Sequence, residues 1–434
     1  MLKNTVYLGL SVESLHHGHI NLIKEGQKYG KILVGLISDK AIAQNKRVPL
    51  LNYNQRKTII ENINGVSKVV TQINYDYSEN IKKYKPEFMI HGDDWQKGSQ
   101  IILRKNALKA LKKYGGKLIE VPYTKDISST ALAEQQFSLG ITPEVRLKSL
   151  KRNLASKNFL RFIEAHSPIS AMIIENLKIN TNKGTKFFDG FWSSSLTDSA
   201  RLGKPDNEVL NISDRLHNIN QIFDVTTKPL IMDIDTGGRV EHLKINVRSM
   251  ERLGISALIM EDKKGLKKNS LLGTSVKQTQ ESITNFSNKI KAVKLSQRDN
   301  DLMLISRIES FILKNGINDA LKRAKSYINA GTDGIMIHSK EKDPSEVFEF
   351  AKKFRKNFKD VPLICVPTSY NNVREEELIR KGFNIVIYAN HLFRAAYPSM
   401  EFAAKSILKN GRSKEIDKKI ISIKKILNLI PGTV

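Results

Sequence analysis

The sequence predicts an α/β protein of two units, an open parallel sheet followed by a closed (β/α)8 barrel with C-terminal helices. Short apolar segments alternate with amphipathic helical segments along most of the chain, which is the pattern of parallel sheets. The alternation is interrupted at residues 133–158, where the run Gly140–Ile141–Thr142–Pro143 precedes a basic helical stretch. Eight strand patterns with intervening helices follow, and eight is the strand count of a TIM-type barrel.

The first unit is expected at residues 1–132, as a Rossmann-like sheet. Its predicted strands are residues 5–10, 31–38, 88–91 and 117–122, and its predicted helices are residues 20–29, 55–63 and 99–114. Residues 133–158 are interpreted as a linker and a docking helix.

The barrel unit is expected at residues 159–434. Its predicted strands are residues 159–165, 187–192, 230–235, 257–261, 302–307, 334–338, 363–366 and 384–389. Helical patterns separate them at residues 169–177, 208–223, 241–253, 275–293, 318–330, 344–358 and 374–381. An open doubly wound sheet is the competing topology. Ionisable or hydrogen-bonding residues follow every strand, which favours the barrel, since catalytic groups of such barrels lie at the carboxyl ends of the strands.

The composition indicates a basic enzyme with small anionic substrates. The 434 residues carry a net charge of +27, and lysine and arginine are spread over nearly every predicted helix. Aromatic residues are not interleaved with them, so a nucleic-acid partner is disfavoured, while a positive field attracts anions. The apolar runs are strand-sized, and the N-terminus lacks a cleavable signal pattern, which predicts a cytoplasmic protein without a membrane segment. The single cysteine, Cys365, excludes an internal disulfide framework.

Three carboxylates at neighbouring strand ends predict a metal site. Asp233 and Asp235 share one face of a strand, and Glu261 ends the next strand. Oxygen-only ligands suit Mg²⁺, with Mn²⁺ as the alternative. Arg307 and His338, at later strand ends, would place cations opposite these carboxylates, and the whole describes a pocket for a small, highly anionic substrate.

Six motifs occur in order over about residues 145–405. They are Trp192–Ser–Ser–Ser–Leu196, Asp206–Asn–Glu208, Asp233–Ile–Asp235–Thr–Gly, the run from Glu261 to Ser270, Arg307–Ile–Glu–Ser–Phe311 and His338–Ser–Lys340. Together they resemble the phosphoenolpyruvate mutase family of the isocitrate lyase superfamily.

The resemblance implies a role for each motif. Asp233 would bind Mg²⁺ directly, with Asp235, Glu261 and Asp206 held through waters. The implied catalytic residues are Asp206, Lys267, Asn269, Arg307 and His338, with Lys267 and Asn269 on a gating loop. The implied substrate-binding residues are Trp192, Ser194, Ser195, Leu196, Asp233, Arg307 and His338, and Ser194 and Leu196 would act through backbone donors.

The implied reaction interconverts phosphoenolpyruvate and 3-phosphonopyruvate by moving a phosphoryl group from the enol oxygen to C3. Asp206 would be either a transient phosphoryl acceptor or an electrostatic anchor. The alternatives are a phosphonopyruvate hydrolase and a carbon–carbon lyase of the same superfamily. Such lyases carry a cysteine in the run that reads Lys263 to Lys267 here, and hydrolases carry threonine in place of Asn269. Both differences favour the mutase.

The first unit carries four motifs of its own. They are Leu15–His–His–Gly–His19, Lys46 after the second strand, His91–Gly–Asp–Asp94–Trp95 and Ile127–Ser128–Ser129–Thr130. They resemble the cytidylyltransferase branch of the HIGH-type nucleotidyltransferases, which implies CTP as a substrate. His16 and His19 would stabilise the α-phosphate, and Lys46 the triphosphate. Asp94 and Trp95 would shape the nucleotide and acceptor pocket, and Ser128, Ser129 and Thr130 would cap phosphates.

Two interpretations of this first unit stay open, because Leu10–Ser11–Val12–Glu13 and Tyr123 depart from the family pattern. It is either an active cytidylyltransferase, for a phosphonate such as 2-aminoethylphosphonate, or a retired domain kept for assembly. The barrel resemblance further implies a phosphonopyruvate decarboxylase as a pathway partner. It also implies a homo-oligomer, dimer or tetramer, that exchanges the helices from His391 onward.

Overall fold

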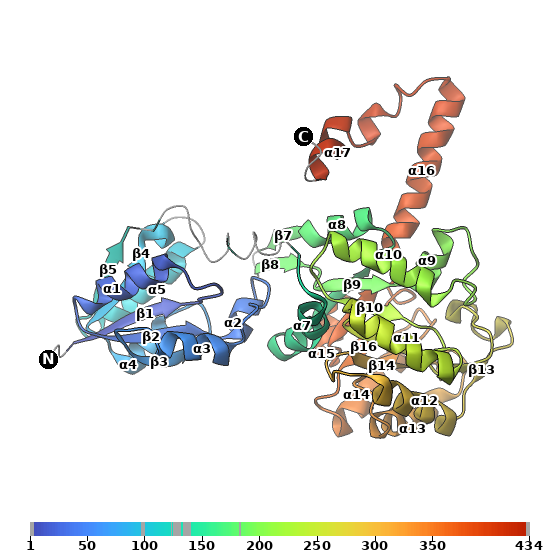
Figure 1. Cartoon of the computed structure of the whole chain (residues 1–434), viewed down its shortest axis with the longest axis horizontal. Coiled ribbons are helices and arrows are strands. Elements are labelled where there is room, and N and C mark those ends of the chain that lie inside the picture. The colour runs from blue at the N-terminus through green and yellow to red at the C-terminus, as the bar shows by residue number, and fades with distance from the viewer. Residues whose placement is uncertain are drawn as a thin grey trace.

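The computed structural model describes residues 4–96, 100–122, 124, 132, 140–181 and 184–430. A five-stranded parallel sheet and a closed eight-stranded parallel barrel form the two main bodies of the chain, with helix α7 (Pro143–Ser156) between them (Figure 1). The predicted fold class, an open parallel sheet followed by a barrel, is therefore confirmed. In the described part of the chain, no helix combines the length and apolar character that crossing a membrane requires.

The front sheet has the strand order β3-β2-β1-β4-β5. Its strands are β1 (Thr5–Leu10), β2 (Lys31–Ile37), β3 (Val66–Gln72), β4 (Phe88–Gly92) and β5 (Lys117–Val121), and its helices are α1 (His17–Gln27), α2 (Asp39–Ala43), α3 (Tyr53–Glu61), α4 (Ser78–Tyr84) and α5 (Ile101–Lys112). Strand β3 was not predicted. It lies at an edge of the sheet and pairs with one strand only, so half of its side chains are polar and exposed, and its apolar pattern is weak.

The barrel closes in the order β10-β11-β14-β15-β16-β17-β6-β9. Its strands are β6 (Leu160–Glu164), β9 (Gly190–Ser193), β10 (Leu230–Asp233), β11 (Ala257–Glu261), β14 (Met303–Ile308), β15 (Gly334–Ile337), β16 (Leu363–Cys365) and β17 (Ile385–Tyr388). The eight predicted strands match these eight, with one correction. The range predicted for the second strand, 187–192, joins two elements, because a hairpin of β7 (Lys178–Thr181) and β8 (Gly184–Phe187) precedes β9.

Glycine is required where β9 begins. A Cβ on Gly190 would lie 2.5 Å from the carbonyl oxygen of Pro229 and 2.2 Å from a ring carbon of Phe162. These contacts are shorter than van der Waals distances, so only glycine lets neighbouring strands approach this closely.

Helices cover the outside of the barrel, and some lie over the end at which its strands finish. They are α8 (Pro168–Asn176), α9 (Ser195–Ala200), α10 (Ile212–Asp224), α11 (Val240–Leu253), α12 (Ile283–Ser296), α13 (Gly316–Asn329), α14 (Ser345–Asn357) and α15 (Glu375–Arg380). Two predicted helices begin later than expected. Glu208 adopts a φ of 65°, which a right-handed helix cannot contain, so α10 starts at Ile212. Before α12, strand β13 (Thr279–Gln280), which pairs with β12 (Lys263–Lys264), lies in the first part of the expected helical range.

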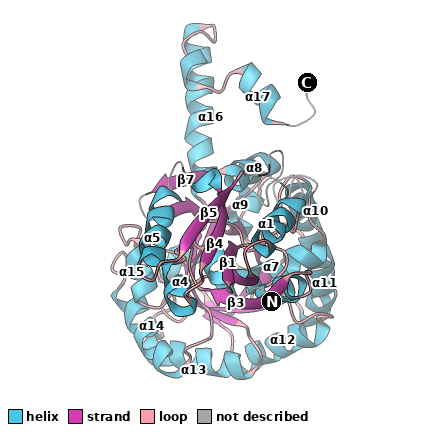
Figure 2. Cartoon of the chain, turned by 90° about the vertical axis from the view of Figure 1, so that its left-hand side faces the viewer, coloured by secondary structure: helices cyan, strands magenta, loops and turns pink. Residues whose placement is uncertain are grey.

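Two layers of apolar side chains hold the barrel together. One fills its interior and the other lies between its strands and the covering helices. Beyond the barrel, α16 (His391–Asn410) and α17 (Ile423–Leu429) project away from it as an arm (Figures 1 and 2). Neither helix has a buried residue.

Candidate active sites

The strands of the barrel carry polar side chains into its interior where they end. In β11, Ala257 and Ile259 point into the barrel, whereas Leu258 and Met260 face the helices. Glu261 therefore continues the interior row. The same two-residue step places four other side chains at this end, namely Asp233, Ser194, Arg307 and His338, each two positions beyond a residue of the interior cluster.

A buried arginine on α10 ties several of these strand ends together. Arg215 is 2% exposed, and its Nε donates to Asp198 Oδ2 at 2.9 Å. Its Nη1 donates to the carbonyl oxygen of Asp233 at 2.5 Å, and its Nη2 to that of Ser193 at 3.3 Å. Arg215 was not among the predicted site residues, because those were sought only at strand ends. The available signal was an arginine on the same helical face as the buried Ile219 and Ile222.

Lys267 lies among the carboxylates predicted to hold a metal. Its Nζ is 2.8 Å from Asp206 Oδ1, and it also contacts Asp235 Oδ1 and Ser195 Oγ. Asn269 Nδ2 donates to the other oxygen of Asp206 at 3.0 Å. The loop between β12 and β13 thus grips Asp206 with two donors, and the structure brings these three predicted catalytic residues together.

Arg307 and His338 form a second group beside the first. Arg307 Nη2 lies 3.0 Å from His338 Nδ1 and 2.6 Å from Ser270 Oγ, and its Nε donates to Glu309 Oε1 at 2.5 Å. Glu309 and Ser270 were not predicted as site residues, although both lie within the quoted motifs. They orient Arg307, whose Nη2 is also 3.3 Å from Glu261 Oε2.

Burial and charge set the protonation of this site. Burial lowers the pKa of His338 and Arg307 lowers it further, so the imidazole is neutral. His338 Nδ1 lies between a donor and an acceptor, 3.0 Å from Arg307 Nη2 and 3.2 Å from Glu309 Oε1, so both residues fix the position of the ring. Burial raises the pKa of Glu261 to about 7. Although burial lowers the pKa of Lys267, Asp235 and Asp233 raise it well above its usual range, so the ammonium stays charged.

The carboxylates predicted to hold a metal surround a lysine in this structure. Among the described residues, no three acidic, histidine or cysteine side chains are arranged around a common point as ligands. The physical reason is that the Lys267 ammonium lies between Asp206 and Asp235. The donor chemistry nevertheless fits a hard cation. Both buried oxygens of Glu261 lack a hydrogen-bond partner among the described residues, although Lys263 Nζ and Arg307 Nη2 lie 3.2 and 3.3 Å from them.

The remaining predicted residues of the barrel lie along the rim and interior of the same site. Ser195 Oγ donates to Asp233 Oδ2 at 3.0 Å, and Ser194 is the buried N-cap residue of α9. Leu196 lies in the first turn of α9. Trp192 is in the interior cluster. Its indole Nε1 is buried and has no hydrogen-bond partner among the described residues.

The front unit places two neutral histidines at the start of α1. His16 caps the helix, its Nδ1 accepting the backbone N–H of Gly18 at 3.2 Å, and His19 Nδ1 accepts the N–H of His16 at 3.3 Å. The two ring centroids are 4.0 Å apart. Burial lowers the pKa of His16, and it lowers that of His19 to about 4. Two imidazoles beside a helix N-terminus can bind phosphate oxygens.

The other predicted residues of the front unit are more scattered. Lys46 Nζ pairs with Glu13 Oε1 at 3.0 Å. Asp94 is partly exposed and lies 3.8 Å from His91 Nδ1. Trp95 is fully buried, stacks on His91 at 3.8 Å and donates to Glu120 Oε1 at 2.8 Å, so it also supports the core. Ser128, Ser129 and Thr130 lie outside the described residues.

Comparisons with known proteins find relatives for both units. Residues 150–408 match the family described as phosphoenolpyruvate phosphomutase, and residues 13–135 match the cytidylyltransferase-like family. A phosphoenolpyruvate phosphomutase of Tetrahymena pyriformis is 34% identical over 281 residues, which cover 64% of this chain and 89% of that protein.

Two solved structures resemble the barrel unit. The crystal structure of a phosphoenolpyruvate phosphomutase from Streptomyces platensis subsp. rosaceus matches with a TM-score of 0.59 and 33% identity, over 64% of this chain and 93% of that chain. A phosphonopyruvate hydrolase in complex with oxalate and Mg²⁺ matches with a TM-score of 0.57 and 32% identity, over 67% and 95%.

Proposed function

Because the chain belongs to the phosphoenolpyruvate phosphomutase family, we propose that its barrel interconverts phosphoenolpyruvate and 3-phosphonopyruvate. The observation that supports this most directly is the grip of Lys267 and Asn269 on both oxygens of Asp206, beside the Arg307–His338 pair. A carboxylate held by two donors beside a cluster of buried charged groups suits a reaction in which charge moves but no group leaves the site.

In the proposed step the bond between phosphorus and the enol oxygen breaks, and the bond between phosphorus and C3 forms within the same molecule. Such transfers pass through a loose transition state with charge spread over the phosphoryl oxygens, so positioning and charge stabilisation carry the catalysis. Arg307, held by Glu309 and Ser270, would bind a phosphoryl or carboxylate oxygen with its remaining donors. His338 would hydrogen-bond the substrate through Nε2, because Nδ1 faces Arg307 and Glu309.

Mg²⁺ would be held by Asp233, Asp235, Glu261 and Asp206, with Lys267 withdrawn from its position between them. When bound, the ion would neutralise the negative charge on the enolate oxygen and on the ligating carboxylates. The support is the set of buried carboxylate oxygens without hydrogen bonds, together with the Mg²⁺ complex of the similar hydrolase.

A phosphonopyruvate hydrolase is the second candidate, because a hydrolase resembles this barrel almost as closely as the mutases do. A mutase has to keep water from the migrating phosphoryl group. Lys267 and Asn269 lie over Asp206 and would exclude water there, and the asparagine matches the mutase pattern implied by the sequence.

The test is a ³¹P NMR time course of the full chain with phosphonopyruvate and Mg²⁺. A growing phosphoenolpyruvate signal that Asp206→Ala abolishes would support the mutase. Inorganic phosphate as the only product would identify a hydrolase. A covalent phosphoryl group on Asp206 would be detected by rapid quench and mass spectrometry, whereas its absence in a competent enzyme would leave the anchoring role.

For the front unit we infer CTP-dependent cytidylylation of a phosphonate such as 2-aminoethylphosphonate. The support is the match to the cytidylyltransferase-like family and the neutral His16–His19 pair at the start of α1. Pyrophosphate release from CTP, dependent on the phosphonate and abolished by His19→Ala, would support it. If pyrophosphate release is absent, the interpretation as a domain retained for assembly is favoured.

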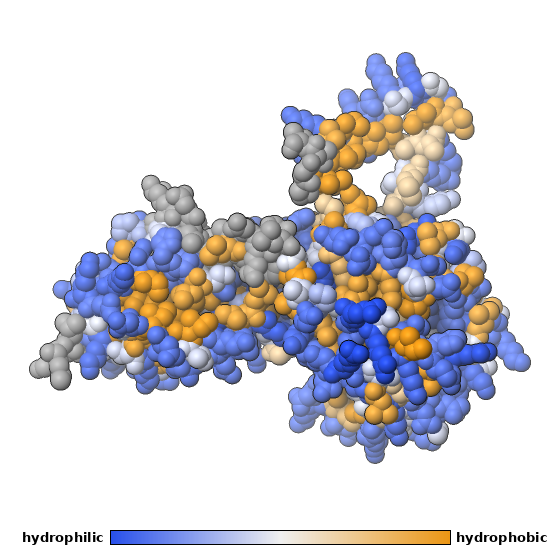
Figure 3. Space-filling view, in the orientation of Figure 1, coloured by the Kyte–Doolittle hydropathy of each residue, from blue (hydrophilic) through white to orange (hydrophobic). Residues whose placement is uncertain are grey.

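We also propose a homo-oligomer, a dimer or tetramer, in which a second copy covers the arm formed by α16 and α17. Figure 3 shows hydrophobic residues gathered along this arm, and its exposed apolar side chains include Tyr397, Met400, Phe402, Leu408 and Ile423. Such a patch on a monomer is a mark of an interface. Analytical ultracentrifugation should give a mass of two or four chains.

We expect a phosphonopyruvate decarboxylase to consume the product. Forming the C–P bond at the expense of an enol phosphate is energetically uphill, so a following decarboxylation would pull the reaction forward.

A further inference from the structure

The loop that carries Lys46 is held by the barrel on the C-terminal side of that residue. Arg47 Nη2 pairs with Glu175 Oε1 at 2.5 Å, and its Nη1 donates to Thr227 Oγ1 at 2.5 Å. Arg152, on α7, donates to the carbonyl oxygen of Leu50 at 2.6 Å and also to that of Pro49. The segment after Lys46 therefore cannot move without breaking contacts to the barrel.

Glu175, at the end of α8, is the centre of this attachment. Its side chain is 12% exposed, and Oε1 accepts from Arg47 Nη2, from Thr227 Oγ1 at 2.5 Å and from the Thr227 N–H at 3.3 Å. Although burial raises the pKa of Glu175, Arg47 and Lys228 hold it below its usual range, so the carboxylate is ionised. Breaking this buried ion pair would leave a charge without a partner, which is costly. The pair therefore holds the Arg47 side chain in one direction and at one distance from Glu175.

Lys46 and Arg47, although adjacent in the sequence, pair with carboxylates in different units. Arg47 reaches the barrel, whereas Lys46 Nζ lies 3.0 Å from Glu13 Oε1 in the front unit, three residues before His16. Anchoring Arg47 thus directs its neighbour Lys46 toward the segment that leads into α1.

A cavity of about 940 Å³ lies at the same junction. Its wall includes Glu13, Lys46 and Arg47 from the front unit and Glu175 and Lys178 from the barrel unit. The cavity is large enough for a phosphate-bearing small molecule, and cations line it from both sides.

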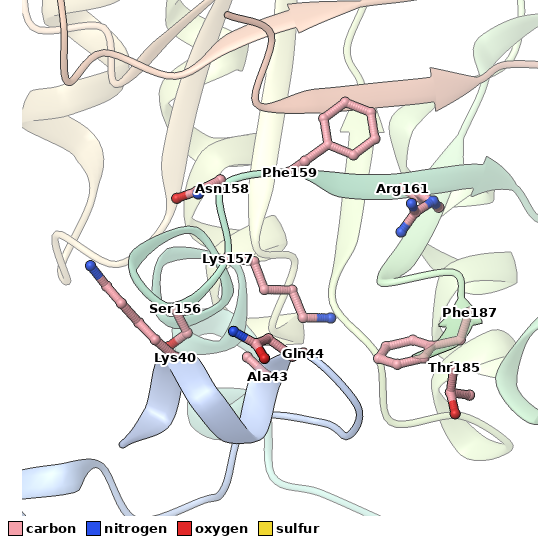
Figure 4. A pocket seen from close by; sticks show the side chains of 10 residues that line it. All are labelled: Lys40, Ala43, Gln44, Ser156, Lys157, Asn158, Phe159, Arg161, Thr185 and Phe187. Carbon is pink, nitrogen blue, oxygen red and sulfur yellow. The ribbon is translucent and has the colours of Figure 1, made fainter. Parts of the chain in front are cut away.

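A second junction next to this one supports the same docking. Figure 4 shows Lys40 and Ala43 of α2, and Gln44 directly after it, near the turn from Ser156 to Phe159, with the side chain of Lys157 directed toward Phe187. Lys157 Nζ lies 4.2 Å from the centre of the Phe187 ring and 2.5 Å from Asp189 Oδ1. Helix α2, which leads into the Lys46 loop, is therefore also seated on the barrel unit.

We propose that the barrel is part of the phosphate site of the front unit. Glu175 is a positioning residue that sets the direction of Lys46 through Arg47, and the cavity between the units receives the phosphate-bearing ligand. This inference rests on the proposed nucleotide chemistry of the front unit.

The test compares Glu175→Gln with Glu349→Gln in the full chain. The first variant keeps the size of the side chain and an acceptor for Thr227 but removes the charge that faces Arg47. The second removes an exposed carboxylate on α14 that pairs only with Lys353 among the described residues. CTP binding is measured by equilibrium dialysis with Mg²⁺, and KM and kcat by pyrophosphate release with 2-aminoethylphosphonate. The barrel reaction in the same preparations reports folding.

We expect Glu175→Gln to raise the Kd and KM for CTP about tenfold with kcat changed less than threefold, and Glu349→Gln to match the wild type. A merely structural role would instead reduce the active fraction, lowering kcat at constant KM, and would overturn the proposal. Unchanged Kd and KM would overturn it too, while cytidylylation stands. A wild-type chain that binds no CTP would overturn both this inference and the proposed function of the front unit.

Discussion

Replacing Lys267 by methionine is expected to destabilise the metal-free barrel. The Lys267 side chain is 5% exposed and its Nζ is 2.8 Å from Asp206 Oδ1. At that separation one pair attracts with about 6 kcal/mol at an effective dielectric constant of about 20. Desolvation offsets part of this, and removing one partner of a buried pair costs about 3–5 kcal/mol. In a barrel of this size, such a loss lowers Tm by roughly 10 °C.

Magnesium is expected to restore most of this stability, because it supplies positive charge to the same carboxylates. An ion present at about a hundred times its Kd stabilises the folded state by about 2.7 kcal/mol. The wild type should gain less, since the Lys267 ammonium already balances Asp206 and Asp235. Differential scanning calorimetry in EDTA and then in excess MgCl₂ measures both shifts for Lys267→Met and for the wild type.

The matched control is Lys268→Met, which removes an exposed lysine from the same loop. It should melt like the wild type in both buffers. If Lys267→Met and the wild type have equal Tm values in EDTA, or if Mg²⁺ stabilises both by the same amount, then Lys267 does not balance the carboxylates in solution and the reasoning is wrong.

In EDTA, the free energy of unfolding should fall by about 3 kcal/mol as the pH rises from 4.5, the ordinary pKa of Glu261, to about 7, its raised pKa in the folded protein. A raised carboxyl pKa stabilises the folded state below this window and loses that effect across it, so urea titrations of Glu261→Gln should lack the slope. Arg215→Met should cost about 3–5 kcal/mol because it leaves Asp198 buried without its cation, and an unchanged urea midpoint would contradict this. Asn269→Thr should divert phosphonopyruvate to pyruvate and inorganic phosphate, because one donor to Asp206 is lost; ³¹P NMR compares the products, and an unchanged product ratio would count against it.

Much of the barrel could be predicted because its strands obey a local rule. Parallel strands buried on both faces are continuous apolar runs, and a two-residue period carries the interior row outward to Asp233, Glu261 and Arg307. Once the strands were located, the residues at their ends followed without knowledge of the packing. This explains why the predicted polar residues at several strand ends lie close together, with Arg307 near both Asp233 and Glu261.

The residues that were missed depend on contacts between distant segments. Arg215 comes from a helix. Its partner Asp198 is 17 residues away in the sequence, and its partner Asp233 is 18 residues away. Likewise, the position of Lys267 among the carboxylates is set by the β12–β13 loop, whose path the sequence does not reveal. Hairpins and the edge strand β3 were missed for a simpler reason, since their side chains are half exposed and their apolar patterns are weak.

The place where the two units meet determines how an intermediate would travel between them. The front unit docks where barrel strands begin, against Lys157 before β6 and Thr227 before β10, whereas Asp233 and Glu261 lie where strands finish. The cavity between the units and the polar strand ends therefore lie at opposite ends of the barrel. On the proposed functions, a molecule released at one site would have to diffuse through the surrounding solution to reach the other. With both proposed functions, the fusion would fix the two activities at equal amounts rather than pass a molecule directly from one site to the other.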